Sequence, residues 1–146
     1  MKQTGYRYTY VFGAVNPLTG ESSGLVCSEC TTEVMNIHLS QISAELSADT
    51  HVILVADNAS WHSSSKDIII PANISILDLP PYSPQLNPIE RLWQWLKDHF
   101  FSNIVIGKDE DLDDLACIIW NKLNSSIIKS VCNVSYLKRI EPLLCL

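Results

Sequence analysis

Residues 80–97 read PPYSPQLNPIERLWQWLK, in which a proline-rich loop runs directly into a strongly amphipathic segment. Each proline fixes its own φ and restricts the residue before it, so the loop is stiff. From Pro88 to about Phe101 the apolar residues recur at helical spacing and form a stripe. The members of this stripe are Ile89, Leu92, Trp93, Leu96 and Phe100. The stretch therefore predicts a helix whose first turn is held at a set place by the loop.

The segments around this loop show strand and helix patterns in alternation. Aromatic, β-branched or continuously apolar runs bounded by turn residues predict strands. These runs are YRYTYVFGAV (6–15), GLVCSE (24–29), HVILVADNA (51–59) and ISILDLP (74–80). NPLTG (16–20) is typical of a tight turn, so the first two runs are expected to form a hairpin. Apolar residues at helical spacing predict a further helix over 32–46. The polar-then-apolar segment 61–70 is expected to be a short helix, and a final helix with an acidic start is expected over 111–123.

The order of these elements indicates an α/β fold. Strands that alternate with helices favour a mainly parallel sheet, and the opening hairpin makes that sheet mixed. We expect helices on both faces and a single domain over residues 1–146, because the sequence has no internal repeat, low-complexity tract or linker. Sites in such sheets form at the carboxyl ends of the strands, and Asp57 lies near the end of an apolar strand.

Composition and charge limit the location and the partners. Hydrophobic residues make up 47% of the chain and charged residues 18%, which is typical of a globular protein. No apolar run reaches the roughly 18 residues of a membrane helix, and the first residues lack the apolar core of a signal peptide. The sequence therefore predicts a cytoplasmic protein without a membrane span. The net charge of -6, with ten Lys and Arg scattered along the chain, predicts weak DNA binding by the chain alone.

Two motifs suggest metal ions but have simpler explanations. Cys27 and Cys30 form a C-x-x-C motif without the second ligand pair that a zinc site needs. Because the five cysteines also give no disulfide framework, reduced thiols are the favoured interpretation. The acidic run DEDLDD (109–114) suits the positive end of a helix dipole better than it suits a metal site.

Asp57 and Glu90 are the candidate catalytic and metal-binding residues. Asp57 follows an apolar strand, where it can cap a following helix or face the ligand edge of the sheet. Glu90 falls at the third helical position, after Asn87 as N-cap and Pro88 at the first position, where a capping-box acid belongs. Both acids therefore keep a structural explanation beside the functional one. Because the stiff loop returns the helix to the edge where the strand ends, we expect the two carboxylates to converge.

Converging carboxylates suit hard divalent cations. Mg²⁺ (or Mn²⁺) binds carboxylate oxygens and retains several waters. Two such ions about 4 Å apart can activate a water and stabilise a leaving 3′ oxygen of DNA. Asn58 and His62 flank Asp57 and could contact substrate, and Trp95 lies off the buried stripe, where it could stack on DNA bases. Ser60 and His62 do not form a hydrolase triad with Asp57, because neighbours on a turn cannot align and no G-x-S-x-G elbow exists.

Three blocks of the sequence carry a family resemblance: YVFGAVNPLTG (10–20), LVADNASWH (54–62) and LPPYSPQLNPIERLWQWLK (79–97). They resemble the catalytic domain of bacterial mariner-like DDE transposases from insertion sequences, and the last block is the most specific. The resemblance implies an RNase H-like fold and metal-dependent cutting and joining of DNA ends, with two Mg²⁺ or Mn²⁺ ions in the complete protein. It also implies that Asp57 matches the second catalytic Asp and Glu90 the final Glu. Their separation of 33 positions (90 − 57) is close to the family's usual interval.

The beginning of the chain departs from the family pattern. In the family the first catalytic Asp lies on a strand upstream of the hairpin, whereas residues 1–48 contain no Asp, and Glu21 in the loop after the turn is a poor substitute. The helix-turn-helix region that recognises transposon ends is also absent. We therefore expect the carboxyl-terminal part of a longer transposase, with the first strand missing and no useful DNA cleavage by the chain alone. An unpaired central strand would favour homo-oligomers or pairing with another chain.

Two alternatives to a catalytic domain stay open. The chain could be a non-catalytic remnant that folds and associates with an intact transposase. It could also be a different RNase H-like nuclease, such as a resolvase, although the Pro-Tyr-Ser-Pro block argues against that interpretation.

Overall fold

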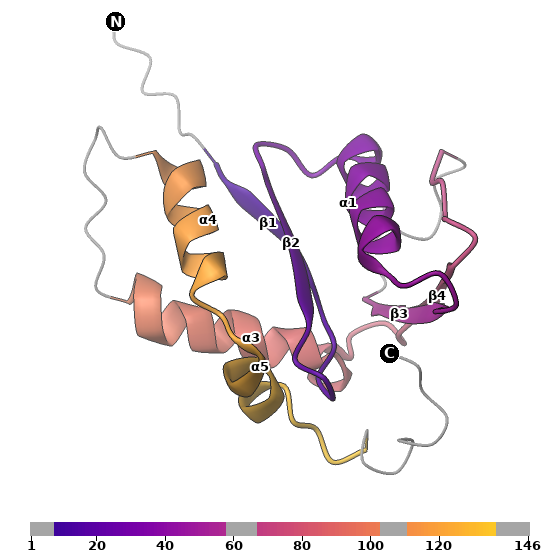
Figure 1. The fold of residues 1–146 in the computed structure, drawn as a ribbon. Helices are drawn as coiled ribbons and strands as arrows, with labels where there is room; N and C mark the ends of the chain where they lie inside the picture. The colour runs from indigo at the N-terminus through magenta and orange to yellow at the C-terminus, as the bar shows by residue number, and fades with distance from the viewer. Residues whose placement is uncertain (1–7, 58–66, 103–110, 137–146) are drawn as a thin grey trace, which may run out of the picture.

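The computed structural model describes residues 8–57, 67–102 and 111–136 of the chain. The strands in these ranges are β1 (Tyr10–Val15), β2 (Ser22–Cys27), β3 (Val52–Ala56) and β4 (Ile74–Asp78). The α-helices are α1 (Thr32–Glu45), α3 (Pro88–Leu96), α4 (Leu112–Asn121) and α5 (Ser125–Val131). Figure 1 shows their arrangement, in which α3 is preceded by a 3-10 turn (Pro84–Leu86) and followed by a π-helical turn (Lys97–Phe101).

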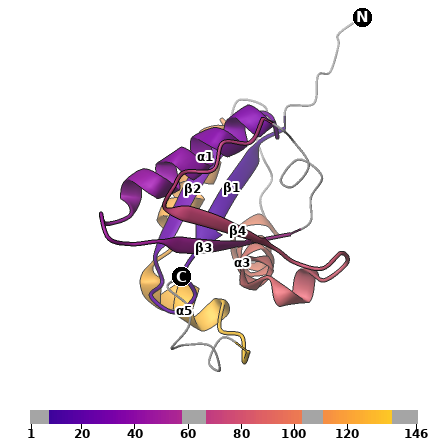
Figure 2. The same ribbon diagram turned by 90° about the vertical axis from the view of Figure 1, so that its right-hand side faces the viewer.

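The strands form two separate two-stranded sheets (Figure 1, Figure 2). β1 pairs with β2 antiparallel, with Phe12 opposite Leu25, and β3 pairs with β4 parallel, with Leu54 opposite Ile76. The α/β class predicted from the sequence is confirmed, but the strands do not form the single mixed sheet that was expected. The physical reason is that β1 and β3 each have one strand partner within the described ranges, so no ladder joins the two pairs there.

The β1–β2 hairpin separates two hydrophobic cores (Figure 1). On one side α1 packs over the hairpin and towards β4, and the buried residues there are Phe12, Met35, Leu39, Ile42 and Ile74. On the other side α3, α4 and α5 pack together, and the buried residues there are Leu92, Leu96, Ile119, Ile128 and Cys132. The layers therefore run from α1 through the hairpin to the three later helices.

Two paired glycines let the hairpin approach the later helices closely. Gly13 and Gly24 lie opposite each other in the ladder. A Cβ atom on Gly13 would lie 2.6 Å from the Trp120 ring and 2.8 Å from the Trp93 ring, and one on Gly24 would lie 2.6 Å from Trp120. The two indole rings pack against each other with their centroids 5.7 Å apart. Trp93 therefore belongs to the packed stripe of α3, as the sequence predicts.

The turn of the hairpin is held against the start of α5. The Asn16 carbonyl accepts a hydrogen bond from Gly20 N–H, and Asn16 N–H donates to the Glu21 carbonyl, both at 2.8 Å. Gly20 has a φ of 80°, and a Cβ atom there would lie 2.4 Å from the Ser125 carbonyl oxygen. This position needs glycine both for its backbone conformation and for its contact with α5. The turn predicted at 16–20 is confirmed.

Three helices differ from the sequence-based expectations. The α-helix that starts at Pro88 ends at Leu96, and the expected continuation to Phe101 is a π-helical turn. Residues 67–70 are not helical, and the rest of the helix expected over 61–70 lies outside the described residues. α5 is not predicted by the sequence pattern, because its seven residues are too few to show a helical period. Its N-cap explains it: Asn124 Oδ1 accepts from Ile127 N–H at 2.8 Å.

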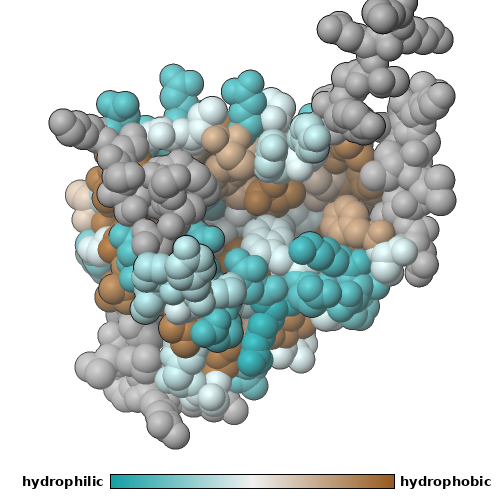
Figure 3. Space-filling view, turned by 180° about the vertical axis from the view of Figure 1, so that it is seen from behind, coloured by the Kyte–Doolittle hydropathy of each residue, from teal (hydrophilic) through white to brown (hydrophobic). Residues whose placement is uncertain are grey.

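Large apolar side chains remain exposed outside the two cores. Ile69 is 71% exposed, Ile37 56% and Leu77 54%. Seen from behind, the surface carries apolar patches beside polar ones (Figure 3). The exposed apolar surface is thus spread over several elements. None of the helices that the structure describes is long and apolar enough to cross a membrane.

Candidate active site

Asp57 lies directly after the end of β3. The carbonyl of Ala56, the last residue of β3, accepts a hydrogen bond of 2.8 Å from Leu79 N–H, which keeps the end of β4 beside it. Ala56 is buried, whereas Asp57 is exposed to solvent. The chain therefore presents this carboxylate at the carboxyl end of a parallel strand pair, where α/β sheets place ligands. The alternative role of Asp57 as a helix cap concerns a segment outside the described residues.

The loop between β4 and α3 is closed by hydrogen bonds as well as by prolines. Leu86 N–H donates to the Ser83 carbonyl at 3.1 Å, and Asn87 N–H donates to the Pro84 carbonyl at 3.0 Å. The Tyr136 hydroxyl donates to the Leu86 carbonyl and so ties the loop to the segment after α5. These bonds add to the stiffness expected from the prolines, and they fix where α3 begins.

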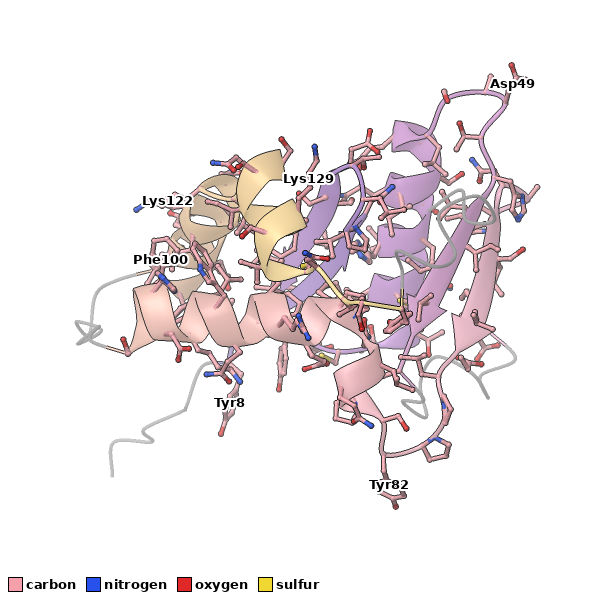
Figure 4. All side chains as sticks on the ribbon, turned by 90° about the horizontal axis from the view of Figure 1, so that it is seen from below. Tyr8, Asp49, Tyr82, Phe100, Lys122 and Lys129 are labelled. Carbon is pink, nitrogen blue, oxygen red and sulfur yellow. The ribbon has the colours of Figure 1, made fainter. Side chains whose placement is uncertain are left out.

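Tyr82 lies at the outer tip of this loop and points away from the body of the molecule (Figure 4). Its φ of 57° is the one positive φ of a non-glycine residue in the described ranges, and its side chain is fully exposed. Because the Tyr82 side chain is fully exposed, packing does not explain an aromatic residue in this position. Its whole surface is available for contact with a second molecule. Sequence reasoning missed Tyr82 as a functional candidate, although its place between two pairs of loop residues rich in proline was a signal.

Glu90 lies in the first turn of α3 and is half-buried. Asn87 caps the helix, since its Oδ1 accepts from Ile89 N–H at 3.4 Å. In a full capping box the Glu90 carboxylate would accept from Asn87 N–H, but that N–H already donates to the Pro84 carbonyl. The capping-box explanation of Glu90 therefore fails, because the bond from Asn87 N–H to the Glu90 carboxylate is replaced by a bond to Pro84. What remains of the structural explanation is the favourable position of an acid at the positive end of the helix dipole.

The negative charge of Asp57 acts electrostatically on the carboxyl of Glu90. Burial raises the pKa of the Glu90 carboxyl, and the negative charge of Asp57 raises it further. The charge of Lys97 acts in the opposite direction and lowers the pKa of Glu90. Two acids from different elements therefore share one electrostatic environment, in which a bound cation would offset their mutual repulsion.

Lys97 is a second residue that sequence reasoning missed. It lies two helical turns after Glu90, so the spacing of seven residues was the available signal. Glu90, Lys97 and Trp93 line a cavity of about 440 Å³ that is completed by residues of β1 and α4. This cavity therefore has an acidic and a basic group on the same wall, beside an indole ring.

The other predicted site residues are Asn58, His62 and Trp95. Asn58 and His62 lie outside the described residues. Trp95 is half-buried, with its ring stacked on His99 at 4.2 Å between centroids and at 23°, and it packs edge-on against Phe100. It was expected to be exposed off the buried stripe, and these contacts leave less of its ring open. Its role as a DNA-stacking residue stays a prediction.

The described part of the acidic run takes the structural role that the sequence favours, and the cysteine motif consists of free thiols. Cys27 is the last residue of β2 and Cys30 lies three residues later. Both are free thiols, and burial raises the pKa of both, which disfavours the thiolate that binds metals. In the acidic run, Asp111 is the N-cap of α4, with its Oδ1 accepting from Asp113 N–H at 3.0 Å. Within residues 8–57, 67–102 and 111–136, no three His, Cys, Asp or Glu side chains come together as a group that could hold a metal ion.

Comparisons with known proteins agree with the resemblance of the sequence. The family model for the DDE superfamily endonuclease matches residues 2–113. The uncharacterized protein y4pE/y4sA of Sinorhizobium fredii is 40% identical over 116 residues, which cover 80% of this chain and 85% of that protein. No solved structure matches the chain significantly. On the strength of the family match, which covers most of its length, the chain belongs to the DDE superfamily endonucleases.

Proposed function

We propose that the chain is the metal-binding part of a mariner-like DNA transposase, with Asp57 and Glu90 as two carboxylate ligands. The observation that carries the proposal is the electrostatic coupling of these two acids, which come from the end of β3 and the start of α3. Membership of the DDE superfamily endonucleases supports it, since the substrate of such a site is then the DNA backbone. An RNase H-like arrangement of the strands is part of the same proposal.

The donor atoms fit Mg²⁺ or Mn²⁺. Carboxylate oxygens are the protein ligands that these hard cations prefer. When bound, the ions supply charge stabilisation at a phosphate and lower the pKa of a bound water. Asp57, being exposed, remains accessible to DNA, while the half-buried Glu90 gives the site one ligand in a region of lower dielectric. Lys97, on the wall of the same cavity as Glu90, is suited to a DNA phosphate.

The number of carboxylates limits what the chain does alone. Two acids hold an ion more weakly than three, and loose geometry slows phosphoryl transfer steeply. Since residues 1–48 contain no Asp, we propose that the chain alone does not cut DNA at a useful rate and that a third acid must come from elsewhere.

The metal site can be tested by titrating the chain with MnCl₂ and following amide signals by NMR. Paramagnetic broadening is expected first at Asp57 and Glu90, at metal concentrations on the order of millimolar. The variants Asp57→Asn and Glu90→Gln should lose it. Asp49→Asn is the matched control, because Asp49 is an exposed acid at the far tip of the turn before β3 (Figure 4). Equal broadening in Glu90→Gln and in the unmodified chain would exclude the site.

A non-catalytic association module is the second candidate, and the gathering of only two acids in the described ranges favours it. Both candidates predict that the chain alone does not nick DNA, but they differ in the effect of Asp57→Asn. In a reaction completed by an intact relative, a catalytic part loses activity with this substitution, whereas an association module does not. Metal-dependent nicking of supercoiled plasmid by the chain alone would show that no further acid is needed.

A further inference from the structure

Two hydrogen bonds join the start of α3 to the segment that follows α5. Arg91 Nη1 donates to the Asn133 carbonyl at 2.7 Å, across 42 positions of the sequence. The Tyr136 hydroxyl donates to the Leu86 carbonyl, across 50 positions. In Figure 4 the chain after α5 runs towards the end of α3 at which the helix begins. A distant segment is therefore attached to the part of the chain that carries Glu90.

The segment 132–136 is itself packed, so it can hold the residues that it bonds. Cys132, the C-cap of α5, is fully buried in the α3–α5 core, and Val134 is buried as well. Tyr136 is half-buried. Burial raises the pKa of its hydroxyl, and the charge of Arg91 lowers it, so the guanidinium lies near enough to act on the phenol. The two hydrogen bonds therefore belong to one contact and are not independent surface bonds.

The two bonds lie on either side of Glu90 along the chain. Leu86 ends the 3-10 turn four residues before Glu90, and Arg91 follows Glu90 directly. Successive residues of an α-helix are rotated by about 100°, so the side chains of Glu90 and Arg91 leave α3 in different directions. The bond of Arg91 can thus fix the rotation of the helix while Glu90 faces another side.

Glu90 depends on the helix backbone for its position. The Asn87 N–H, which a capping box would offer to the Glu90 carboxylate, donates to the Pro84 carbonyl. The carboxylate is therefore placed by the first turn of α3 and not by a capping-box bond. Mg²⁺ needs nearly ideal octahedral geometry, and the side chains of such a site have to be held within about 0.5 Å. A metal ligand at this position needs a fixed helix start.

We propose that Arg91 and Tyr136 are positioning residues, which hold the first turn of α3 so that the Glu90 carboxylate stays within reach of Asp57. Both act through the backbone and need no contact with a metal ion or with DNA. The inference rests on the proposed metal site and assigns to that site a support from residues 132–136. These residues lie outside the match to the family model, which covers residues 2–113.

The main test variant is Tyr136→Phe, which removes one hydroxyl and leaves every charge unchanged. Broadening of the amide signals at Asp57 and Glu90 is followed by NMR as MnCl₂ is added. The variant should need at least about tenfold more metal, because loss of a group that orients a ligand weakens metal binding by this factor. Ser135→Ala is the matched control, since it removes a hydroxyl from an exposed residue of the same segment. Its response to MnCl₂ should equal that of the unmodified chain.

A second readout measures the position of the helix start without metal. Residual dipolar couplings of the amides of residues 89–92, relative to those of β3, report the direction and order of the first turn. Tyr136→Phe should change these couplings. Ile128→Val is the control for a general loss of stability, because it removes a methyl group from the α3–α5 core and leaves both bonded pairs intact. It should leave both readouts unchanged.

Arg91 provides a conservative pair of variants. Arg91→Met should act like Tyr136→Phe, whereas Arg91→Lys keeps a donor and should lose less metal affinity. In a chain that binds Mn²⁺, the proposal is overturned if Tyr136→Phe leaves either readout unchanged, or if Ile128→Val changes both as much.

Failure of the metal site itself gives a different result. If the unmodified chain shows no broadening at Asp57 and Glu90, the proposed metal site is wrong. A change of the dipolar couplings in Tyr136→Phe would still show that residues 132–136 hold the start of α3. Unchanged couplings would overturn that role as well.

Discussion

The two sides of the β1–β2 hairpin differ in how completely they are filled. Towards α3 and α4, the hairpin has glycines at positions 13 and 24, and because they lack side chains the rings of Trp93 and Trp120 pack directly against the backbone. Towards β3, the edge of the same hairpin borders a cavity of about 490 Å³. One strand thus takes part both in a close contact with two tryptophan rings and in the wall of a cavity.

The difference shows two separate requirements for a stable sheet protein. Packing of a face needs complementary side-chain shapes, which the tryptophans and glycines provide. Pairing of an edge needs a neighbouring backbone, which no choice of side chain can replace. The α1 side also contains a buried polar group, His38, whereas the buried residues of the α3–α5 core are apolar or Cys.

The largest expected effect is a difference in lost stability between a substitution in the α3–α5 core and one on the β3 edge at the cavity. Leu92 is fully buried in the α3–α5 core, so Leu92→Ala should lower the free energy of unfolding by about 3 kcal/mol through lost burial and a new cavity. Ile53 is half-buried and already borders a cavity, so Ile53→Ala should cost only about 1 kcal/mol. Urea unfolding followed by tryptophan fluorescence measures both. Equal losses would mean that the edge of β3 is as well packed as the core.

The next effect concerns the glycine pair. Gly13→Ala puts a Cβ atom 2.6 Å from the Trp120 ring, which must shift, and a loss of about 2 kcal/mol is expected. Ser22→Ala on the exposed start of β2 is the control, with a change within about 0.5 kcal/mol. Fluorescence of the native state is a second readout, since displacement of Trp93 and Trp120 should change their emission. An unchanged spectrum and stability would show that the rings are not held against the glycines.

The third effect is a pH dependence from His38. Burial lowers the pKa of this imidazole from 6.5 to about 4, and no described group bonds its Nδ1. Because the folded state holds His38 neutral, its contribution to stability is intact above the unfolded pKa and is lost as pH falls from 6.5 towards 4. By pH 5 the loss amounts to about 2 kcal/mol of unfolding free energy.

The variant His38→Leu isolates this dependence. It removes the titrating group while keeping an apolar side chain beside Phe12, whose ring centroid lies 6.0 Å from that of His38. The difference in unfolding free energy between pH 7 and pH 5 should therefore shrink in the variant. A variant whose pH dependence matches that of the unmodified chain would place the titrating group elsewhere.

The elements that the sequence predicts well are those with a long local period. The hairpin, α1, β3, β4 and the start of α3 agree with alternation, apolar runs or the i, i+3, i+4 stripe. The electrostatic coupling of Asp57 and Glu90 was also predictable, because strand ends and a stiff loop restrict where two residues can lie. Their roles as metal ligands stay predictions.

What the sequence does not predict depends on partners distant along the chain. The division into two sheets arises because strand pairing is decided between segments, not within them. The loss of the capping-box bond at Glu90 depends on Pro84 taking the Asn87 N–H, a detail of the 3-10 turn. The packing of Trp120 against Gly13 and Gly24 involves residues of three elements, so no local sequence pattern predicts it.

The smallest expected effect is at the acidic pair, and it runs opposite to those in the cores. The pKa of the Glu90 carboxyl is raised in the folded state by burial and by Asp57. A carboxyl with a raised folded pKa favours folding below its unfolded pKa, and this contribution is lost as pH rises through the folded pKa. At neutral pH the ionised Glu90 therefore opposes folding. Since Glu90 is only half-buried, solvent screens the effect, and Glu90→Gln should raise the stability by a few tenths of a kcal/mol, roughly.

Divalent cations should reverse the order of stability of the unmodified chain and the Glu90→Gln variant. MgCl₂ at about 10 mM is expected to raise the melting temperature of the unmodified chain, because a ligand that binds only the folded state stabilises it. Glu90→Gln should gain less, so that it is the more stable protein without metal and loses that advantage with it. NaCl at matched ionic strength controls for screening of the net charge of -6. If Glu90→Gln is less stable than the unmodified chain without metal, then Glu90 stabilises the start of α3 through the helix dipole. In that case the pair Asp57 and Glu90 does not lower the stability of the fold.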